Sequence, residues 1–546
     1  MLRLTELKLP LDHTPDALRD AVLTRLAIPS DDLLTLAVAR RAYDARRRSA
    51  INLVYAVDVT VRDEAAALAA DPTLRPTPDT QYRLPIHVPS PTNRPVVIGT
   101  GPCGLMAALT LAEMGFRPLI LERGQPVRQR TKDTWGLWRR AVLNPESNVQ
   151  FGEGGAGTFS DGKLYSGIKD PRHLSRKLLT TFVEAGAPDD ILTNSKPHIG
   201  TFRLVTVVEG IRTRIEALGG EYRFAARVED IHLDATRHIR GLTLAGGEEI
   251  DADHVILAIG HSARDSFAML HRNGVHIEAK PFSIGARIEH PQSLIDRARF
   301  GAFAGHPLLG SADYKLVHHA SNGRSVYSFC MCPGGRVVAA TSEAGCVATN
   351  GMSQYSRAEF NANAGIVVGI TPADYPADPL AGIAFQQTWE HRAFLTGGST
   401  YAAPAQRVGD LLAAKASSAL GEIVPSYKPG THPADLAACL PGFAIEAIRE
   451  ALGKFDRDIP GFAMHDAVLT GVETRTSSPI RITRGPDGQS LNTKGLFPAG
   501  EGAGYAGGIM SAGVDGIRVA EAVAASLTGS SLVEPMTRGQ AAVAYG

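Results

Sequence analysis

The sequence has little of what marks a secreted, membrane-embedded or nucleic-acid-binding protein. Only five cysteines occur among 546 residues, an odd and sparse count that argues against a disulfide framework and indicates a reducing compartment. Lys plus Arg and Asp plus Glu each number 56, so no charge excess favours a nucleic acid or a membrane surface as partner. Residues 1–10 lack the apolar core of a signal peptide, and no apolar run is of membrane-spanning length. We therefore expect a cytoplasmic protein.

The sequence also lacks a metal site, since no cluster of His, Cys, Asp or Glu has the spacing of metal ligands.

The chain is long enough for roughly three domains. Its hydrophobic share of 44% and charged share of 21% are those of a globular protein. We expect an N-terminal α+β module over residues 1–90, a nucleotide-binding domain formed by 91–285 and 471–546, and a substrate-facing domain over 286–470.

The stretch VVIGTGPCGLMAALTLAEMGFRPLILE, residues 96–122, reads as strand, tight turn, helix and second strand. Gly99 lets the chain leave the strand sharply, Gly101 removes a side chain that would block a pyrophosphate, and Gly104 permits close helix packing. The helix N-terminus favours the negative phosphates, and Glu122 ends the second strand where a ribose hydroxyl is bound. A bare G-x-G-x-x-G also occurs in ordinary turns, but here the whole context predicts a dinucleotide-binding unit.

Other stretches surround this unit. Before it, we predict strands at 2–9, 33–40 and 51–61 and a helix at 14–26, with a solvated turn favoured over an RNA contact for the arginines at 40–48. After it, the glycine-rich segment at 151–164 suggests a backbone that lies against something flat or charged. Predicted strands at 222–233, 253–260, 285–290, 324–330, 336–341 and 495–502 and helices at 175–185, 204–218, 405–419, 434–452 and 509–527 complete the chain.

Several strings resemble a known flavoprotein family. VVIGTGPCG with Glu122, LAIG at 257–260 and LFPAGEGAGYAGGI at 496–509 look like the FAD-binding fold of the glutathione-reductase superfamily. FGEGGAGTFSDGKL, AIGHSARD, KPFSIGARIEHPQ and GEGAGYAGGIMSAGVDGI resemble the FAD-dependent dehydrogenase or oxidoreductase family related to aminoacetone-oxidase-like flavoproteins. The resemblance implies an α/β fold with a Rossmann-like FAD-binding domain, an inserted α+β substrate domain and a small N-terminal α+β module.

The same resemblance implies roles for individual residues. Val228 would meet the adenine through its backbone, and Glu501 stands where the superfamily usually has Asp. The helix opened by Gly507 and Gly508 would point at the flavin, where its dipole favours the negative charge of the reduced ring. The residues implied to bind FAD are Gly99, Gly101, Pro102, Cys103, Gly104, Glu122, Arg123, Arg130, Gly155, Ala156, Gly157, Thr158, Ser160, Val228, Ala258, Gly260, Gly500, Glu501, Gly507, Gly508 and Ile509.

Cys330 and Cys332 are the catalytic candidates. A flavin beside a dithiol is a known electron route, so the C-x-C pair could be redox-active. On a regular strand both side chains would point to one face, and a disulfide between such near neighbours has unfavourable geometry. We therefore favour two buried or ligand-lining thiols.

Two further sets of residues could have either a functional or a structural role. His261 could bind substrate or cofactor, and hydrogen bonding at a helix start explains it equally well. Arg475, Arg481 and Arg484 could bind an anionic substrate through bidentate hydrogen bonds, but we favour a solvated or salt-bridged strand.

The function we expect is hydride transfer between a small organic substrate and N5 of FAD. No second complete nucleotide-binding unit is present, although NAD(P)H could still deliver electrons directly. A flavin-dependent RNA-modifying enzyme is one alternative, which the balanced charge disfavours. A non-catalytic flavoprotein redox sensor is the other.

Overall fold

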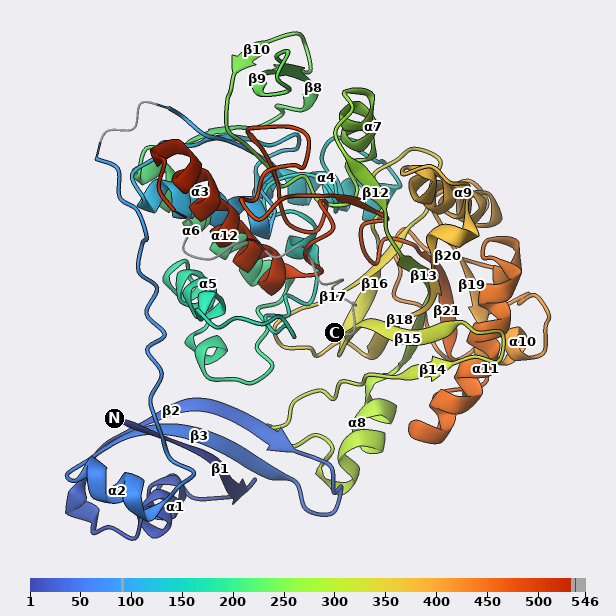
Figure 1. Cartoon of the computed structure of the whole chain (residues 1–546). Helices are drawn as coiled ribbons and strands as arrows, with labels where there is room; N and C mark the ends of the chain where they lie inside the picture. Colours follow the sequence, from blue (N-terminus) through green and yellow to red (C-terminus); the bar gives the residue numbers. More distant parts are fainter. Residues whose placement is uncertain (90–92, 532–535, 537–546) are drawn as a thin grey trace.

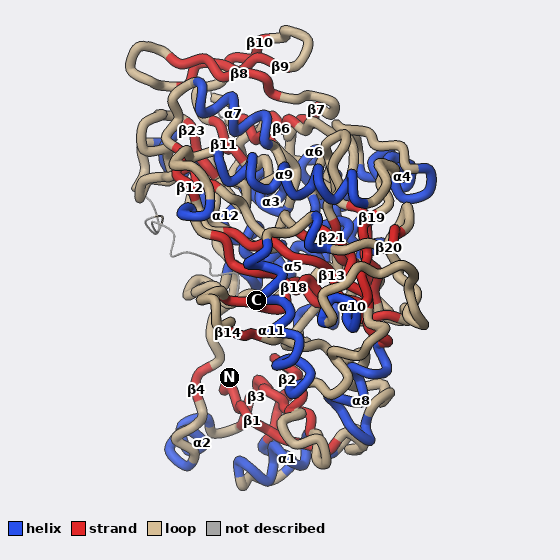
Figure 2. Tube along the Cα trace, turned by 90° about the vertical axis from the view of Figure 1, so that its right-hand side faces the viewer, coloured by secondary structure: helices blue, strands red, loops and turns tan. Residues whose placement is uncertain are grey.

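The computed structural model describes residues 1–89, 93–531 and 536 (Figure 1). The predicted boundary at residues 90/91 and the end of the last predicted segment, at 546, therefore lie outside the described residues. Two large sheets dominate the chain, one parallel and one antiparallel, and a smaller module lies below them in Figures 1 and 2. No helix in the described part of the chain is both long and apolar enough to cross a bilayer.

The N-terminal module is a four-stranded sheet of order β2-β3-β1-β4 with two helices. Burial alternates residue by residue along β3, the pattern of a half-buried strand. The predicted strands and helix of this module are confirmed. Its elements are β1 (Leu2–Pro10), α1 (Ala17–Leu26), β2 (Leu33–Asp44), β3 (Asn52–Val61), α2 (Glu64–Ala70) and β4 (Arg75–Pro76).

Two of the arginines at 40–48 make structural contacts, and Arg47 and Arg48 are exposed. The backbone N–H of Arg41 donates to the carbonyl O of Thr193 at 2.7 Å, and its guanidinium donates to Asn194 at 3.0 Å. Arg46 forms an ion pair with Asp44 at 2.6 Å. Arg41 thus docks the module onto the rest of the chain.

The parallel sheet has the order β23-β11-β5-β6-β7. Apart from the edge strand β7, its short strands are apolar on both faces, as buried parallel strands are. Val97, for example, packs in one core, while Val96 and Ile98 pack in another. The strands are β5 (Val96–Ile98), β6 (Leu119–Leu121), β7 (Glu221–Arg223), β11 (Val255–Leu257) and β23 (Leu496–Pro498).

Helices cover one face of this sheet, and a β-meander with one helix covers the other (Figures 1 and 2). The first layer is α3 (Pro102–Glu113), α5 (Leu174–Glu184), α6 (Thr201–Ala217) and α12 (Ile509–Thr528); the second is β8 (Val228–Leu233), β9 (Ile239–Leu244), β10 (Glu249–Asp251) and α7 (Arg264–Arg272). The predicted α/β class with a Rossmann-like parallel sheet is confirmed.

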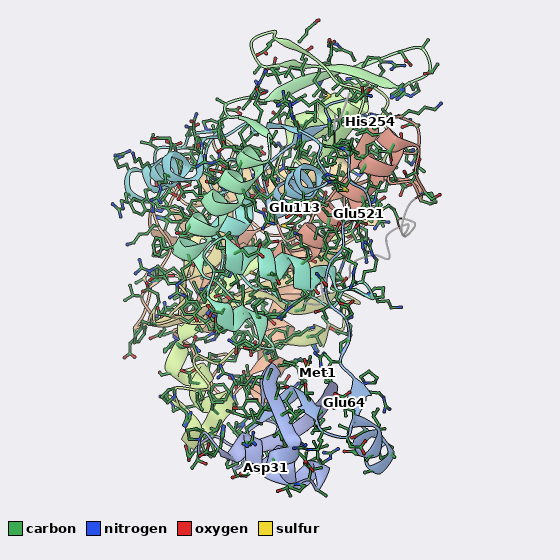
Figure 3. The ribbon with its side chains drawn as sticks, turned by 90° about the vertical axis from the view of Figure 1, so that its left-hand side faces the viewer. Met1, Asp31, Glu64, Glu113, His254 and Glu521 are labelled. Atoms are coloured by element: carbon green, nitrogen blue, oxygen red, sulfur yellow. The ribbon has the colours of Figure 1, made fainter. Side chains whose placement is uncertain are left out.

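Ion pairs strengthen the helical layer. Glu113 of α3 binds Lys177 of α5 at 2.7 Å, and Glu521 of α12 binds Arg172 at 2.6 Å and accepts a hydrogen bond from Tyr82 at 2.9 Å. Figure 3 labels both glutamates. The segment that leaves the N-terminal module is thereby tied to α12.

The second large sheet has the order β14-β15-β18-β13-β21-β19-β20 and is antiparallel except for its β19–β20 pair. Its strands are β13 (Phe282–Pro291), β14 (Val317–His319), β15 (Ser325–Cys332), β18 (Asn361–Ile370), β19 (Ala403–Arg407), β20 (Thr431–Pro433) and β21 (Val468–Glu473). The elements around the two sheets are α4 (Val127–Arg140), β12 (Ile277–Ala279), α8 (Gln292–Phe300), β16 (Gly335–Ala339), β17 (Thr349–Ser353), α9 (Ala381–Thr396), α10 (Val408–Leu412), α11 (Gly442–Asp458) and β22 (Ile480–Ile482).

Several predicted elements were wrong in extent or type; the strand predicted at 495–502, for example, ends at Pro498. The predicted helix at 405–419 begins as β19, because pairing with β21 overrides the helix propensity of its alanines. The predicted strand at 222–233 is divided between β7 and β8, where Ala225 has φ +53°. The helix predicted at 434–452 instead begins after Pro441, a residue well suited to a helix start, and ends at Asp458.

Candidate cofactor site

One cavity of about 1690 Å³ opens at the carboxyl ends of the central parallel strands. The loops after β5, β11 and β23 all line it, through Gly99, Gly260 and Gly500. In open α/β sheets this edge is where ligands bind. The cavity also reaches the antiparallel sheet, where Cys330 and Met331 of β15 line it.

Three glycines shape the turn between β5 and α3. Gly99 has φ +95°, a conformation that favours glycine. A Cβ on Gly104 would lie 1.9 Å from the carbonyl O of Gly99, so only glycine lets α3 approach β5 this closely. A Cβ on Gly101 would meet only the Cα of Gly155, at 3.8 Å, and would otherwise project into open space. Gly101 therefore keeps the N-terminus of α3 accessible from the cavity.

Glu122 lines the cavity and joins three turns through its carboxylate. Its Oε2 accepts hydrogen bonds from the N–H and the hydroxyl of Thr100 at 3.0 and 2.6 Å. Its Oε1 accepts from the N–H groups of Gly124 and Gly152 at 2.8 and 3.0 Å. The carboxylate thus fixes the glycine-rich segment against the first nucleotide-binding turn.

Arg130 requires a correction. It is fully buried and does not line the cavity. Its guanidinium donates to the carbonyl O atoms of Asn148, Val149, Glu153 and Gly155 at 2.7–2.9 Å. Burial lowers its pKa to about 10. Arg130 therefore holds the glycine-rich loop from behind, and the prediction that it binds the cofactor was wrong.

The start of α12 forms the opposite wall. Gly507, Gly508 and Ile509 line the cavity, and a Cβ on either glycine would have no atom within 4 Å. The 20-residue helix α12 therefore presents free N–H groups and the positive end of its dipole to the cavity. Such a site favours a negatively charged group.

Two of the three arginines weighed for an anionic substrate, Arg475 and Arg484, are held by protein carboxylates, whereas Arg481 does not line the cavity. Arg484 pairs with Asp515 at 2.6 Å, and Arg475 pairs with Glu390 at 3.0 Å. Both arginines line the cavity and both are nearly buried. The salt-bridged interpretation agrees with the structure for Arg475 and Arg484. The guanidinium carbon of Arg481 instead lies 5.5 Å from the ring centroid of Tyr505.

The titratable side chains that line the cavity include His261, Glu501, Lys163 and Cys330. Burial, with Arg475 and Arg264 nearby, lowers the pKa of His261 to about 3, so this imidazole is neutral. Burial raises the pKa of Glu501 to about 7. The Nε2 of His261 lies 3.8 Å from Oε1 of Glu501. Sequence reasoning missed Lys163, whose only signal was its place at the end of the glycine-rich segment.

The structure brings together most of the predicted site residues. The predicted residues that do not line the cavity are Gly104, Arg130, Thr158 and Cys332. Those that do line it are Gly99, Gly101, Pro102, Cys103, Glu122, Arg123, Gly155, Ala156, Gly157, Ser160, Val228, Ala258, Gly260, Cys330, Gly500, Glu501, Gly507, Gly508 and Ile509.

Two family descriptions match the chain. Residues 281–476 match "FAD-dependent protein, C-terminal domain-like", and residues 1–60 match a domain of unknown function, DUF8436. Among solved structures, a mutant of the halogenase PltM in complex with FAD is 13% identical, with a TM-score of 0.38 over 80% of this chain and 70% of that one. Glycine oxidase from Bacillus cereus ATCC 14579 is 12% identical, with a TM-score of 0.35 over 82% of this chain and 100% of that one.

A curated sequence is much more similar. An uncharacterized protein of Clostridium beijerinckii (strain ATCC 51743 / NCIMB 8052) is 44% identical over 526 residues, which cover 95% of this chain and 98% of that protein. The cavity fits the cofactor that the domain match implies, because two helix N-termini and side-chain-free glycines face it. The chain belongs to one family with this Clostridium beijerinckii protein, and it is an FAD-dependent protein.

Proposed function

We propose that this protein is an oxidoreductase that transfers a hydride between a small organic substrate and N5 of FAD. The observation that carries the proposal is the continuity of one cavity. It runs from the nucleotide-binding turn at Gly101 to Cys330 and Met331 of the antiparallel sheet. A substrate held against that sheet would thus share a single cavity with the cofactor.

The residues that would hold FAD follow from the walls of the cavity. Gly101 and the N-terminus of α3 would bind the pyrophosphate, and Val228 would meet the adenine. Glu122 would fix the turns around the ribose. The open N-terminus of α12, at Gly508 and Ile509, would face the flavin. When bound, FAD supplies the redox chemistry.

The substrate end carries groups suited to proton transfer. Glu501, with a pKa of about 7, can hold or release a proton near neutral pH. His261 is neutral and can donate or accept a hydrogen bond without adding charge. The hydrogen of a reacting C–H bond would leave as hydride, so the role of Glu501 would be to accept the proton of an adjoining N–H group, or to supply the proton when a substrate is reduced.

We further propose a cytoplasmic location, a relation to aminoacetone-oxidase-like flavoproteins and NAD(P)H as one electron donor.

The test is anaerobic reduction of the purified holoprotein, followed by the flavin absorbance near 450 nm (about this value for oxidised flavin). NADH and NADPH are added first, then amines, hydroxy acids and amino acids. Loss of absorbance with any one of these identifies the reductant and supports the proposal. A Glu501→Gln variant should bind FAD yet lose the pH dependence of that reduction near pH 7. Holoprotein that stays oxidised with every compound would favour the non-catalytic alternative.

A further inference from the structure

The Cys330-Met331-Cys332 segment is not a regular strand. In the pairing of β15 with β18, Phe329 lies opposite Gly365 and Cys332 lies opposite Asn363, so β15 has one extra residue there. This is a β-bulge, and Cys330 within it has φ +42°. Left-handed backbone at a residue other than glycine costs free energy and concentrates at functional sites. The unfavourable disulfide geometry expected for Cys330 and Cys332 applies to a regular strand, and β15 is not regular at these residues.

The two thiols lie close together, at different depths. Cys330 lines the cavity, whereas Cys332 is fully buried behind it. The Cys332 thiol donates a hydrogen bond to the backbone carbonyl O of Cys330 at 3.3 Å. One sulfur can therefore meet a ligand in the cavity while the other remains shielded behind it.

Two cations hold this segment in place. The ammonium group of Lys163 donates a hydrogen bond to the carbonyl O of Met331. The guanidinium of Arg287 donates to the carbonyl O of Cys330 at 3.2 Å and pairs with Glu473 at 2.9 Å. Positive charge beside a sulfur stabilises the thiolate, which is the reactive form of cysteine.

The electrostatics differ between the two sulfurs. The neighbouring Cys332 thiol, together with the charges of Lys163 and Arg287, lowers the pKa of Cys330 against the effect of burial. The neighbouring Cys330 sulfur and burial raise the pKa of Cys332. By contrast, burial raises the pKa of Cys346 to about 11 and that of Cys439 to about 12. Cys330 is thus the exceptional thiol among these four.

We propose that Cys330 and Cys332 form a reversible disulfide that exchanges an electron pair with the FAD bound in the same cavity. This inference rests on the proposed function. In the oxidising direction the Cys330 thiolate and the Cys332 thiol form an S–S bond, the one proton of the Cys332 thiol leaves, and two electrons pass to oxidised FAD. In the reverse direction the S–S bond breaks as two electrons return from reduced FAD, Cys332 regains its proton and Cys330 becomes a thiolate again. The enzyme would thereby store two electron pairs per chain.

The test is an anaerobic titration of the air-oxidised holoprotein with dithionite. Wild-type protein should take up about four electrons per FAD, two for the flavin and two for the disulfide. The Cys330→Ser and Cys332→Ser variants should each take up about two. Cys346→Ser is the matched control, a buried cysteine that does not line the cavity, and it should still take up about four.

Mass spectrometry of wild-type protein gives a second readout that needs no variant. The proteolytic peptide that contains residues 330–332 should be about 2 Da lighter from oxidised than from dithionite-treated protein, and should resist alkylation when oxidised. Uptake of only two electrons by wild-type protein, with both cysteines alkylated in the oxidised sample, would overturn the proposal. Absence of bound flavin would instead defeat the proposed function, and the mass shift would still report on the disulfide.

Discussion

Arg484 and Asp515 form a buried ion pair in the wall of the cavity. Nη2 and Nη1 of Arg484 donate to the carboxylate at 2.6 and 3.0 Å. The same carboxylate accepts from the N–H of Gly500 at 2.7 Å, and Arg484 also donates to the carbonyl O of Pro498. The pair therefore fixes the end of β23 against α12, which places the last two cavity-lining segments relative to each other.

Replacement of Asp515 tests this arrangement. Asp515→Ala leaves the Arg484 guanidinium buried without its partner, and we expect a loss of about 3–5 kcal/mol in the free energy of unfolding. The control is Asp32→Ala, which removes a pair with the largely exposed Arg62 and should cost less than about 1 kcal/mol. Urea unfolding followed by circular dichroism measures both. Equal losses of unfolding free energy in the two variants would show that the buried Arg484–Asp515 pair stabilises the fold no more than an exposed pair does.

Two neighbouring glycines should respond to alanine in opposite ways. Gly104→Ala places a methyl group 1.9 Å from the carbonyl O of Gly99, so the FAD-free protein should be destabilised or fail to fold. Gly101→Ala meets nothing closer than 3.8 Å, so the FAD-free protein should keep its stability. The methyl group would occupy the space for the pyrophosphate, however, and FAD affinity should fall at least about tenfold.

Thermal unfolding without FAD and fluorescence titration with FAD separate these two effects. If Gly101→Ala binds FAD as tightly as wild-type protein, the pyrophosphate does not lie at this turn.

Glu153 should make stability depend on pH. Burial raises its pKa from 4.5 to about 7, while the N–H of Val127 still donates to its carboxylate at 2.8 Å. The folded state therefore keeps a proton that the unfolded state releases between these values. The stabilising contribution is fully present below pH 4.5 and is lost as pH rises through 7.

In Glu153→Gln this loss is absent, so the variant should gain stability relative to wild type between pH 5 and pH 8, by at most about 3 kcal/mol. Glu209→Gln, which removes a partner of the exposed Arg128, is the control. A constant stability difference across this pH range would contradict the prediction.

The nucleotide-binding elements could be predicted because their signals are local. The glycines at 99, 101 and 104 have fixed roles in a turn, and the β-branched run before them can only be a buried strand. The return segment at 496–509 was recognised for the same reason. The predicted strands and helices in these regions agree with the structure to within a few residues.

The features that could not be predicted depend on contacts between segments that are distant in the sequence. The sequence around Arg130 suggests a phosphate-binding residue. In the structure its guanidinium instead donates to carbonyl O atoms of the loop that surrounds it. The alanines near 405 favour a helix, and only the partner strand β21 makes them a strand. The bulge at Cys330 arises from pairing with β18 and has no local signal.

The most direct test of this account is the flavin content of the purified protein. We predict a yellow protein with absorbance maxima near 370 and 450 nm (about these values for oxidised flavin) and one FAD released per chain on denaturation. Apoprotein reloaded with FAD should regain the same spectrum and saturate at the same ratio. Protein that contains no flavin and cannot be loaded with FAD would contradict the assignment of the cavity, and with it the proposed function.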